Sequence, residues 1–184
     1  MDLVNNNTSF YSRDELIKIG FKSLGSNVQL SRKASIYNAK KIEIGNHVRI
    51  DDFCILSGTI KLGNNIHISA FCGLYGAGTI SMEDYSGLSP RTTLFSASDD
   101  FSGDFLIGPL LPEEYTNVKK APINIGKYCQ LGAGCIVLPN VTIGEGVSVG
   151  AISLVNKDLQ AWKIYKGIPA KYYKERSKLL LNLL

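Results

Sequence analysis

The chain has 184 residues, 45% of them hydrophobic, and its 20 Lys and Arg against 16 Asp and Glu give a net charge of +4. No apolar run approaches the twenty residues that a transmembrane helix needs, and no signal peptide is evident, so we expect one soluble domain in the cytoplasm without a membrane span. The aromatic residues do not alternate with a basic stripe, which argues against nucleic acid as a partner.

The first predicted element is a short helix over residues 13–19. Ser12 and Glu15 have the spacing of a capping box, and Gly20 is a suitable stop. We expect residues 1–23 to form an N-terminal helical cap on the open end of the element that follows.

From Leu24 onward an apolar residue recurs every six positions, a period that fits neither a helix nor an ordinary strand and indicates a solenoid. A second small or apolar residue precedes most of these rungs by two positions, so both side chains point inward from one strand. Three strands would close a triangular coil, which predicts about six coils over residues 24–160. The rungs are Leu24, Leu30, Ile36, Ile44, Ile50, Leu56, Leu62, Ile68, Leu74, Met82, Leu88, Leu94, Ile125, Leu131, Val137, Ile143, Val149 and Val155.

All four cysteines occupy the inward position two residues before a rung, where a small apolar side chain belongs. We therefore expect packing roles for Cys54, Cys72, Cys129 and Cys135, and neither disulfides nor a metal site.

One long interruption, residues 95–122, separates rungs Leu94 and Ile125. Loops of this length are usually functional or disordered, and this one is rich in Asp and Glu. We interpret it as an arm that projects from the column and helps to build a site; a disordered insertion is the alternative.

After the ladder, residues 161–184 are expected to form a closing hairpin and a C-terminal helix. Its leucines would pack on a neighbouring subunit, because so many exposed leucines are unusual on a monomer. The basic residues of this segment are either a solvated tail or an attraction for phosphate.

The six-residue ladder resembles that of the hexapeptide-repeat acyltransferases, over about Leu24 to Arg176. This resemblance implies an all-β solenoid, a left-handed parallel β-helix, that assembles as a homotrimer and uses acetyl-CoA as acyl donor with no metal. The handedness rests on the resemblance alone, since the general rule for parallel crossovers gives the opposite hand.

The resemblance extends to sugar acetyltransferases of the maltose and galactoside type, in which the segment Tyr-Thr-Ala-Thr-His-Pro presents the catalytic histidine. Here Phe95 to Asp100 reads Phe-Ser-Ala-Ser-Asp-Asp, so Asp99 stands in place of the histidine, and Arg91 in place of an earlier asparagine. A hydroxyl acceptor still requires a proton acceptor. His67, which projects from a flat face, is our first candidate for that base.

Asp99 is the second catalytic candidate, either as a base if burial raises its pKa or by orienting His67 or a substrate amine. A salt bridge to Arg91 is the structural alternative. The other histidine, His47, lies in a corner, where polar residues are ordinary. Resemblance to surface-polysaccharide acetyltransferases adds substrate-binding candidates, each with a structural alternative such as capping a turn or packing against the arm: Arg91, Asp100, Tyr75 and Asp52.

On the donor side, the resemblance implies that the pantetheine arm runs along the edge of the last coils and that basic residues lie near the phosphates of the coenzyme. Lysine in place of the family's arginine keeps the charge but loses bidentate geometry. The residues that match are Ala133, Ala151, Asn156, Lys157, Lys171 and Lys174.

These observations predict acetyl transfer from acetyl-CoA to a sugar hydroxyl in surface-polysaccharide biosynthesis (O-antigen or capsule), directly, in a cleft between subunits. The first alternative is N-acetylation of a nucleotide-linked amino sugar, which needs less help from a base. Acetylation of an antibiotic hydroxyl and a non-catalytic trimeric scaffold remain open. A zinc enzyme that uses three histidines is disfavoured because the chain has two.

Overall fold

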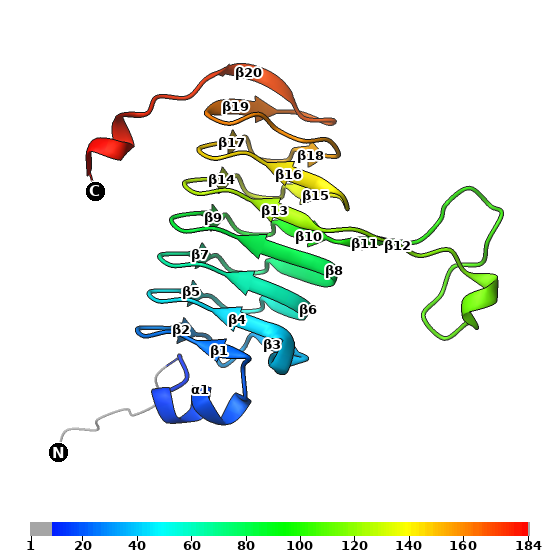
Figure 1. Ribbon diagram of the computed structural model, residues 1–184, viewed down its shortest axis with the longest axis horizontal. Helices are drawn as coiled ribbons and strands as arrows, with labels where there is room; N and C mark the ends of the chain where they lie inside the picture. Colours follow the sequence, from blue (N-terminus) through cyan, green and yellow to red (C-terminus); the bar gives the residue numbers. More distant parts are fainter. Residues whose placement is uncertain (1–8, 184) are drawn as a thin grey trace.

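Hexapeptide units of the chain form short strands that stack as parallel neighbours, one coil on the next (Figure 1). The computed structural model describes residues 9–183, which build a β-solenoid of about seven turns with an arm that leaves the column part-way along. Within the described residues, no helix combines the length and the apolar content needed to cross a membrane. Residues 1–8 of the expected N-terminal cap and Leu184 of the expected C-terminal helix lie outside the described part.

Two sheets run along the column, and a small third sheet forms the arm. The ten-stranded sheet contains β1 (Ser23–Leu24), β3 (Ser35–Tyr37), β4 (Ile42–Ile44), β6 (Ile55–Leu62), β8 (Gly73–Met82), β10 (Thr93–Phe95), β13 (Ile123–Ile125), β15 (Ile136–Val137), β16 (Val141–Ile143) and β18 (Leu154–Val155). The eight-stranded sheet contains β2 (Gln29–Leu30), β5 (Arg49–Ile50), β7 (His67–Ile68), β9 (Gly87–Leu88), β14 (Gln130–Leu131), β17 (Ser148–Val149), β19 (Lys163–Lys166) and β20 (Lys171–Glu175). Short 3₁₀ turns cover Ala39–Lys41, Glu113–Tyr115 and Leu179–Leu183.

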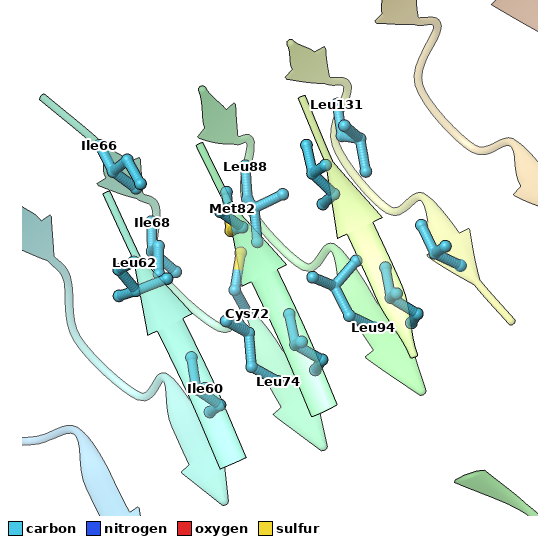
Figure 2. Close-up of a cluster of buried hydrophobic side chains, with 14 of the residues drawn as sticks. Ile60, Leu62, Ile66, Ile68, Cys72, Leu74, Met82, Leu88, Leu94 and Leu131 are labelled. Carbon is cyan, nitrogen blue, oxygen red and sulfur yellow. The ribbon is translucent and has the colours of Figure 1, made fainter. Parts of the chain in front are cut away.

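The strand register confirms the predicted ladder. Leu56 pairs with Leu74, eighteen positions later, so three hexapeptide units make one coil. Every rung is buried except Leu24 and Ile36 of the first coil, which are partly buried. Figure 2 shows the rungs of successive coils filling one continuous interior. Each buried aliphatic side chain contributes roughly 1.5–3 kcal/mol, and this burial requires a neighbouring coil.

The solenoid continues beyond the predicted ladder. For this reason the structure has about seven turns, whereas the sequence predicted about six. Val149 pairs with Tyr165, and Ile143 forms a bridge with Leu159, in both cases sixteen positions later instead of eighteen. The last turn is therefore two residues shorter than the others, and its buried residues no longer follow the six-residue spacing of the ladder. Leu159 and Tyr165 are nevertheless buried and close the interior.

Asparagine and aspartate side chains link the corners of successive coils. The Oδ1 atom of Asn46 accepts a hydrogen bond from the backbone N–H of Ser26 (2.8 Å), that of Asn64 from Asn46 (2.9 Å) and that of Asp84 from Asn64 (2.7 Å). Each of these side chains belongs to the coil after the one whose N–H it binds. Corner N–H groups that have no strand partner are thereby satisfied.

The predicted N-terminal helix is confirmed as α1 (Arg13–Ile19). Ser12 and Glu15 form the expected capping box, and Gly20 ends the helix in the left-handed conformation at φ 78°. Leu16 is buried against the first coil. The helix is also held from outside, because both guanidinium nitrogens Nη1 and Nη2 of Arg32 donate to the Glu15 carboxylate, at 2.9 and 2.7 Å.

The C-terminal end differs from the prediction of a helix. Residues Lys171–Glu175 form strand β20, which pairs antiparallel with β19, and helical geometry is confined to the 3₁₀ turn at Leu179–Leu183. Pairing with β20 satisfies the backbone groups that β19 would otherwise expose as the last edge of its sheet. The leucines of the 3₁₀ turn stay largely exposed.

The interruption at 95–122 is a projecting arm with an ordered root (Figure 1). Its two sides pair as the antiparallel strands β11 (Ala97–Ser98) and β12 (Lys119–Lys120). Buried Ser96 anchors the root, because its hydroxyl donates to the Tyr75 carbonyl and accepts from the N–H of Gly78, both at 2.8 Å. Large apolar side chains are exposed beyond the ribbon: Phe101, Phe105, Leu106, Ile107, Leu110, Leu111, Tyr115 and Val118.

Candidate active site

His67 lies on β7 and projects outward from the eight-stranded sheet, because the neighbouring rung Ile68 points inward. Its imidazole is 53% exposed. Strand pairing aligns one outward residue of each successive coil with His67, so that these residues form a row along the eight-stranded sheet. This row contains Gln29, Arg49, His67, Gly87, Gln130 and Ser148.

The imidazole of His67 is hydrogen-bonded to Asp51 of the preceding coil, with 2.7 Å between Nε2 and Oδ2. The Nε atom of Arg49 donates to the other oxygen of the same carboxylate, also at 2.7 Å. Burial acts to raise the pKa of Asp51, but the hydrogen bonds from His67 and Arg49 outweigh burial and lower it. An ionised Asp51 accepts the proton on Nε2, so Nδ1 is the nitrogen of a neutral His67 that is left to accept a proton.

Sequence reasoning selected Asp52 and missed Asp51. The hydroxyl of Ser31 donates to Asp52, and the Lys33 ammonium forms an ion pair with it at 3.0 Å. These two hydrogen bonds, Ser31 first, lower the pKa of Asp52. A substrate-binding role for Asp52 stays a prediction. The repeat contained a signal for Asp51. Rungs Ile50 and Ile68 are eighteen positions apart and therefore stack on each other, which brings Asp51, next to Ile50, close to His67, next to Ile68.

The two aspartates of the arm have different surroundings. Asp100 is engaged within the arm, where it accepts the backbone N–H of Ser102 (2.9 Å) and the amide of Asn117 (2.6 Å). Hydrogen bonds from Ser102, followed by that from Asn117, lower the pKa of Asp100. The half-buried Asp99 differs, since its carboxylate has no hydrogen-bond or ion-pair partner within residues 9–183. Its carboxylate is therefore free to bind a substrate.

Arg91 and Tyr75 are both engaged with aromatic rings. The Arg91 guanidinium lies over Phe71, with its central carbon 5.5 Å from the ring centre, and the ion pairs of the described residues include none from Arg91 to Asp99 or Asp100. Tyr75 stacks on Phe95 at the root of the arm, with 5.2 Å between ring centres. Substrate contacts by Arg91, Tyr75 and Asp100 stay predictions.

The structure does not bring His67 and Asp99 together within one chain. His67 belongs to the eight-stranded sheet, whereas Asp99 follows β11 on the arm. In Figure 1 the arm leaves the column on the side away from the ends of β5, β7 and β9. A site that uses both residues therefore needs a second copy of the chain.

The small residues predicted to contact the coenzyme lie exposed at one corner of the column. Ala133 and Ala151 belong to successive coils, joined by a hydrogen bond from the N–H of Ile152 to the carbonyl of Ala133 (2.8 Å). Neither side chain extends past Cβ, so a ligand can approach the backbone here. Asn156 and Lys157 are also exposed but follow β18 at another corner, so the predicted donor residues do not form one cluster.

Lys171 and Lys174 lie on β20 within a basic hairpin. Lys171 pairs with Lys166 of β19, and the Lys166 ammonium lies 3.7 Å from the ring centre of Tyr173. Lys174 lies opposite Ile164, next to Lys163. The ion pairs of residues 9–183 include none from these lysines, so their charges are available to a phosphate group.

The four cysteines are free thiols buried in the core, at the inward positions expected for them. Burial raises the pKa of Cys129 to about 11, which keeps its thiol protonated near neutral pH. Among the described residues, no group of three His, Cys, Asp or Glu is arranged to hold a metal ion.

Comparison with known proteins decides the family. Residues 122–157 match the family model described as bacterial transferase hexapeptide (six repeats). The chain is 44% identical over 172 residues to the dTDP-4-amino-4,6-dideoxy-D-glucose acyltransferase of Escherichia coli, covering 92% of this chain and 90% of the relative. The chain belongs to the hexapeptide-repeat acyltransferase family. The predicted family, fold class and acyltransferase activity are thereby confirmed.

Two further members of this family are similar over most of their length. AntD, an N-acyltransferase from Bacillus cereus solved with dTDP and 3-hydroxybutyryl-CoA, is 50% identical with a TM-score of 0.93, covering 96% of this chain and 94% of that one. The putative colanic acid biosynthesis acetyltransferase WcaF of Escherichia coli K12 is 32% identical, covering 88% of this chain and 73% of the relative.

Proposed function

We propose that the chain transfers an acyl group from a coenzyme A thioester to the amino group of a nucleotide-linked sugar. The similarity that carries this proposal is the 44% identity, over about nine-tenths of both chains, to an enzyme named for acylating dTDP-4-amino-4,6-dideoxy-D-glucose. AntD, described as an N-acyltransferase, has also been solved with that nucleotide sugar. These relatives support the N-acylation alternative better than our first prediction of O-acetylation. We place the reaction in the cytoplasm, where coenzyme A thioesters and nucleotide sugars are made.

The donor residues fit a coenzyme A thioester. Small side chains at Ala133 and Ala151 leave room for the thin pantetheine arm, and the unpaired charges of Lys171 and Lys174 suit its phosphates. Asn156 and Lys157 are further candidates for contact. The thioester supplies an activated carbonyl; the chain has to position it and manage the proton of the acceptor.

We place the active site between two copies of the chain in a homotrimer, with His67 from one copy and Asp99 from another. The positions of the two residues on different sides of the column support this arrangement, as does the apolar surface at the end of the arm. Docking of that surface on a neighbouring column would bury it and bring Asp99 toward the flat face.

In this arrangement His67 accepts a proton from the attacking group through Nδ1, while Asp51 holds the ring and stabilises its protonated form. The unpartnered carboxylate of Asp99 binds the amine of the acceptor in its ammonium form, which releases one proton to solvent before the neutral amine attacks the thioester. Arg91, Tyr75, Asp100 and Asp52 remain candidates for contacts with the rest of the sugar nucleotide.

O-acetylation of a sugar hydroxyl in surface-polysaccharide biosynthesis is the second candidate. The similarity to WcaF favours it, and the Asp51–His67 pair provides the base that a hydroxyl requires.

The test is an assay of the purified chain with dTDP-4-amino-4,6-dideoxyglucose, using acetyl-CoA and 3-hydroxybutyryl-CoA in parallel. We expect release of free thiol together with a nucleotide sugar whose mass has increased by one acyl group. No product from the amino sugar, with product from the analogue that carries a hydroxyl in place of the amine, would replace the proposal by O-acylation.

A further inference from the structure

Phe53 and Phe71 form an apolar patch at one corner of the column. Their rings stack with 5.0 Å between centres, yet the two residues remain 49% and 50% exposed. Both are in the left-handed conformation, at φ 59° and 63°, which bulky side chains rarely adopt. The equivalent position two coils beyond Phe71 carries Gly134, which adopts this conformation without strain. The fold alone therefore does not require aromatic rings at this corner.

A positive charge lies at each end of this patch. The Lys33 ammonium is 5.4 Å from the ring centre of Phe53, and the guanidinium carbon of Arg91 is 5.5 Å from that of Phe71. Lys33 is paired with Asp52, whereas Arg91 forms no ion pair within residues 9–183. We call Lys33, Phe53, Phe71 and Arg91 the phenylalanine corner. Its surface is apolar in the middle and has an unpaired positive charge at one end.

The arm has the complementary surface. Residues 99–118 contain five acidic residues and no Lys, Arg or His. The ion pairs found in the described part of the chain include none from these carboxylates. The same stretch carries the large exposed apolar side chains of the arm, of which Phe101 is 78% and Leu110 97% exposed. An acidic, apolar arm therefore fits a basic, apolar corner.

The height at which the arm leaves the column favours this corner. The arm begins after Phe95, which belongs to the same coil as Arg91, and this coil stacks directly on the coil of Phe71. In Figure 1 the arm leads away from its own column. Rotation about an axis parallel to the column does not change the height of a residue, so the arm of one copy would meet a neighbouring copy near these coils.

Tyr85, at a different corner, is the alternative apolar contact at this height. It is 43% exposed and stacks on Tyr128. However, it directly follows Glu83 and Asp84, and the one lysine beside Tyr128, Lys127, already lies 4.0 Å from the Asp84 carboxylate. These acidic groups would repel the acidic arm, so charge selects the phenylalanine corner.

We propose that the phenylalanine corner of one copy is the docking surface for the arm of the next copy; this inference rests on the trimeric site of the proposed function. Apolar side chains of the arm pack on the exposed parts of Phe53 and Phe71, and carboxylates of the arm face Arg91. His67 lies four residues before Phe71, on the strand that leads into this corner. A docked arm therefore borders the flat face and carries Asp99 toward the His67 of its neighbour.

The first test removes the two rings. Asparagine tolerates the left-handed conformation, so Phe53→Asn/Phe71→Asn should leave the column folded by circular dichroism. Tyr85→Asn is the matched control, because Tyr85 has the same conformation at φ 59°, a similar exposure and a stacking partner. In analytical ultracentrifugation the double variant should need a concentration about tenfold or more above that of the wild type to assemble, whereas Tyr85→Asn should match the wild type.

The second test exchanges charges between the corner and the arm. Arg91→Glu should weaken assembly about tenfold, and the arm substitutions Asp104→Lys/Glu113→Lys/Glu114→Lys in the same chain should recover part of this loss. A role of Arg91 confined to its own chain would give no recovery. Lys178→Glu is the control, since it removes a cation that lies over an aromatic ring elsewhere on the column and should not affect assembly.

Two results would overturn the inference: assembly of Phe53→Asn/Phe71→Asn at wild-type concentrations, or no recovery of Arg91→Glu by the arm substitutions. A wild type that is active as a monomer would also overturn it and would remove the trimeric site, but not the transfer to an amine. Sedimentation measures assembly, whereas the assay with the amino sugar measures the reaction, so failure of one proposal does not imply failure of the other.

Discussion

The hydrogen bond between Asp51 and His67 distinguishes Asp51 from its neighbour Asp52, although the two aspartates look equivalent in the sequence. Asp51 binds an imidazole and a guanidinium, whereas Asp52 turns toward Ser31 and Lys33. A carboxylate that acts only through the imidazole should affect catalysis only while the imidazole is present. This property distinguishes a positioning residue from one that binds substrate.

We therefore expect Asp51→Asn to lower kcat/KM by about tenfold or more and His67→Ala by about a hundredfold, in the range usual for loss of acid–base assistance. The double variant should be no slower than His67→Ala alone, because Asp51 acts through His67. Steady-state kinetics on the four proteins of this cycle measures the coupling.

Glu43→Gln serves as the control for loss of an ion-paired carboxylate, because Glu43 binds Lys22 on the other large sheet and should leave the rate unchanged. If Asp51→Asn slows the His67→Ala enzyme as much as it slows the wild type, Asp51 acts independently of the imidazole.

Among the elements, α1 is tied to the first coil by an ion pair between Glu15 and Arg32. Hydrogen bonds from Arg32, and then those from Ser12, lower the pKa of Glu15 to about 2. In an unfolded chain the pKa of glutamate is about 4.3. Because the folded pKa is the lower one, Glu15 stabilises the docked helix fully above pH ~4.3 and loses this effect as the pH falls toward 2.

Glu15→Gln should accordingly remove part of the acid sensitivity of α1. Amide hydrogen exchange of residues 13–19 in the wild type should accelerate relative to the rest of the column between pH 4.3 and 2. In the variant this acceleration should be smaller, because the helix is already loosened at higher pH. Asp14→Asn, in the same turn but in no ion pair of the described residues, is the control. Identical pH profiles for wild type and Glu15→Gln would contradict this account.

At the scale of the whole molecule, the proposed function and the separation of His67 from Asp99 together predict that catalysis requires the assembly. Two variants that should each lose most of their activity, His67→Ala and Asp99→Asn, should regain activity when they are unfolded together and refolded as mixed trimers. With random assembly about a quarter of the interfaces would combine an intact His67 with an intact Asp99.

Refolding each variant separately and then mixing the two at low temperature is the control, since intact trimers that do not exchange subunits should stay inactive. Mixed trimers without activity, despite wild-type size by sedimentation, would place both residues of a site in one chain or would remove one of them from catalysis.

The sequence predicted most of the column because a buried rung every six residues has no other regular explanation. It missed the last turn because that turn is two residues shorter and buries Tyr165 in place of an aliphatic rung. The closing hairpin was expected, but its second strand, β20, was predicted as part of the C-terminal helix, because leucines dominate the segment by composition, while strand pairing with β19 determines the structure of Lys171–Glu175. For the site, the outward position of His67 followed from its rung, but the choice between Asp51 and Asp52 depended on side-chain direction within a corner.

The Asn and Asp side chains that link the corners of successive coils also determine the order in which the coils can be completed during synthesis. Asn46, Asn64 and Asp84 each satisfy a backbone group of the coil that was synthesised before their own. A chain emerging from the ribosome cannot complete any of these corners until the next coil has left the exit tunnel. The growing solenoid should thus lag one coil behind synthesis, with a moving, unfinished end that only the final hairpin closes.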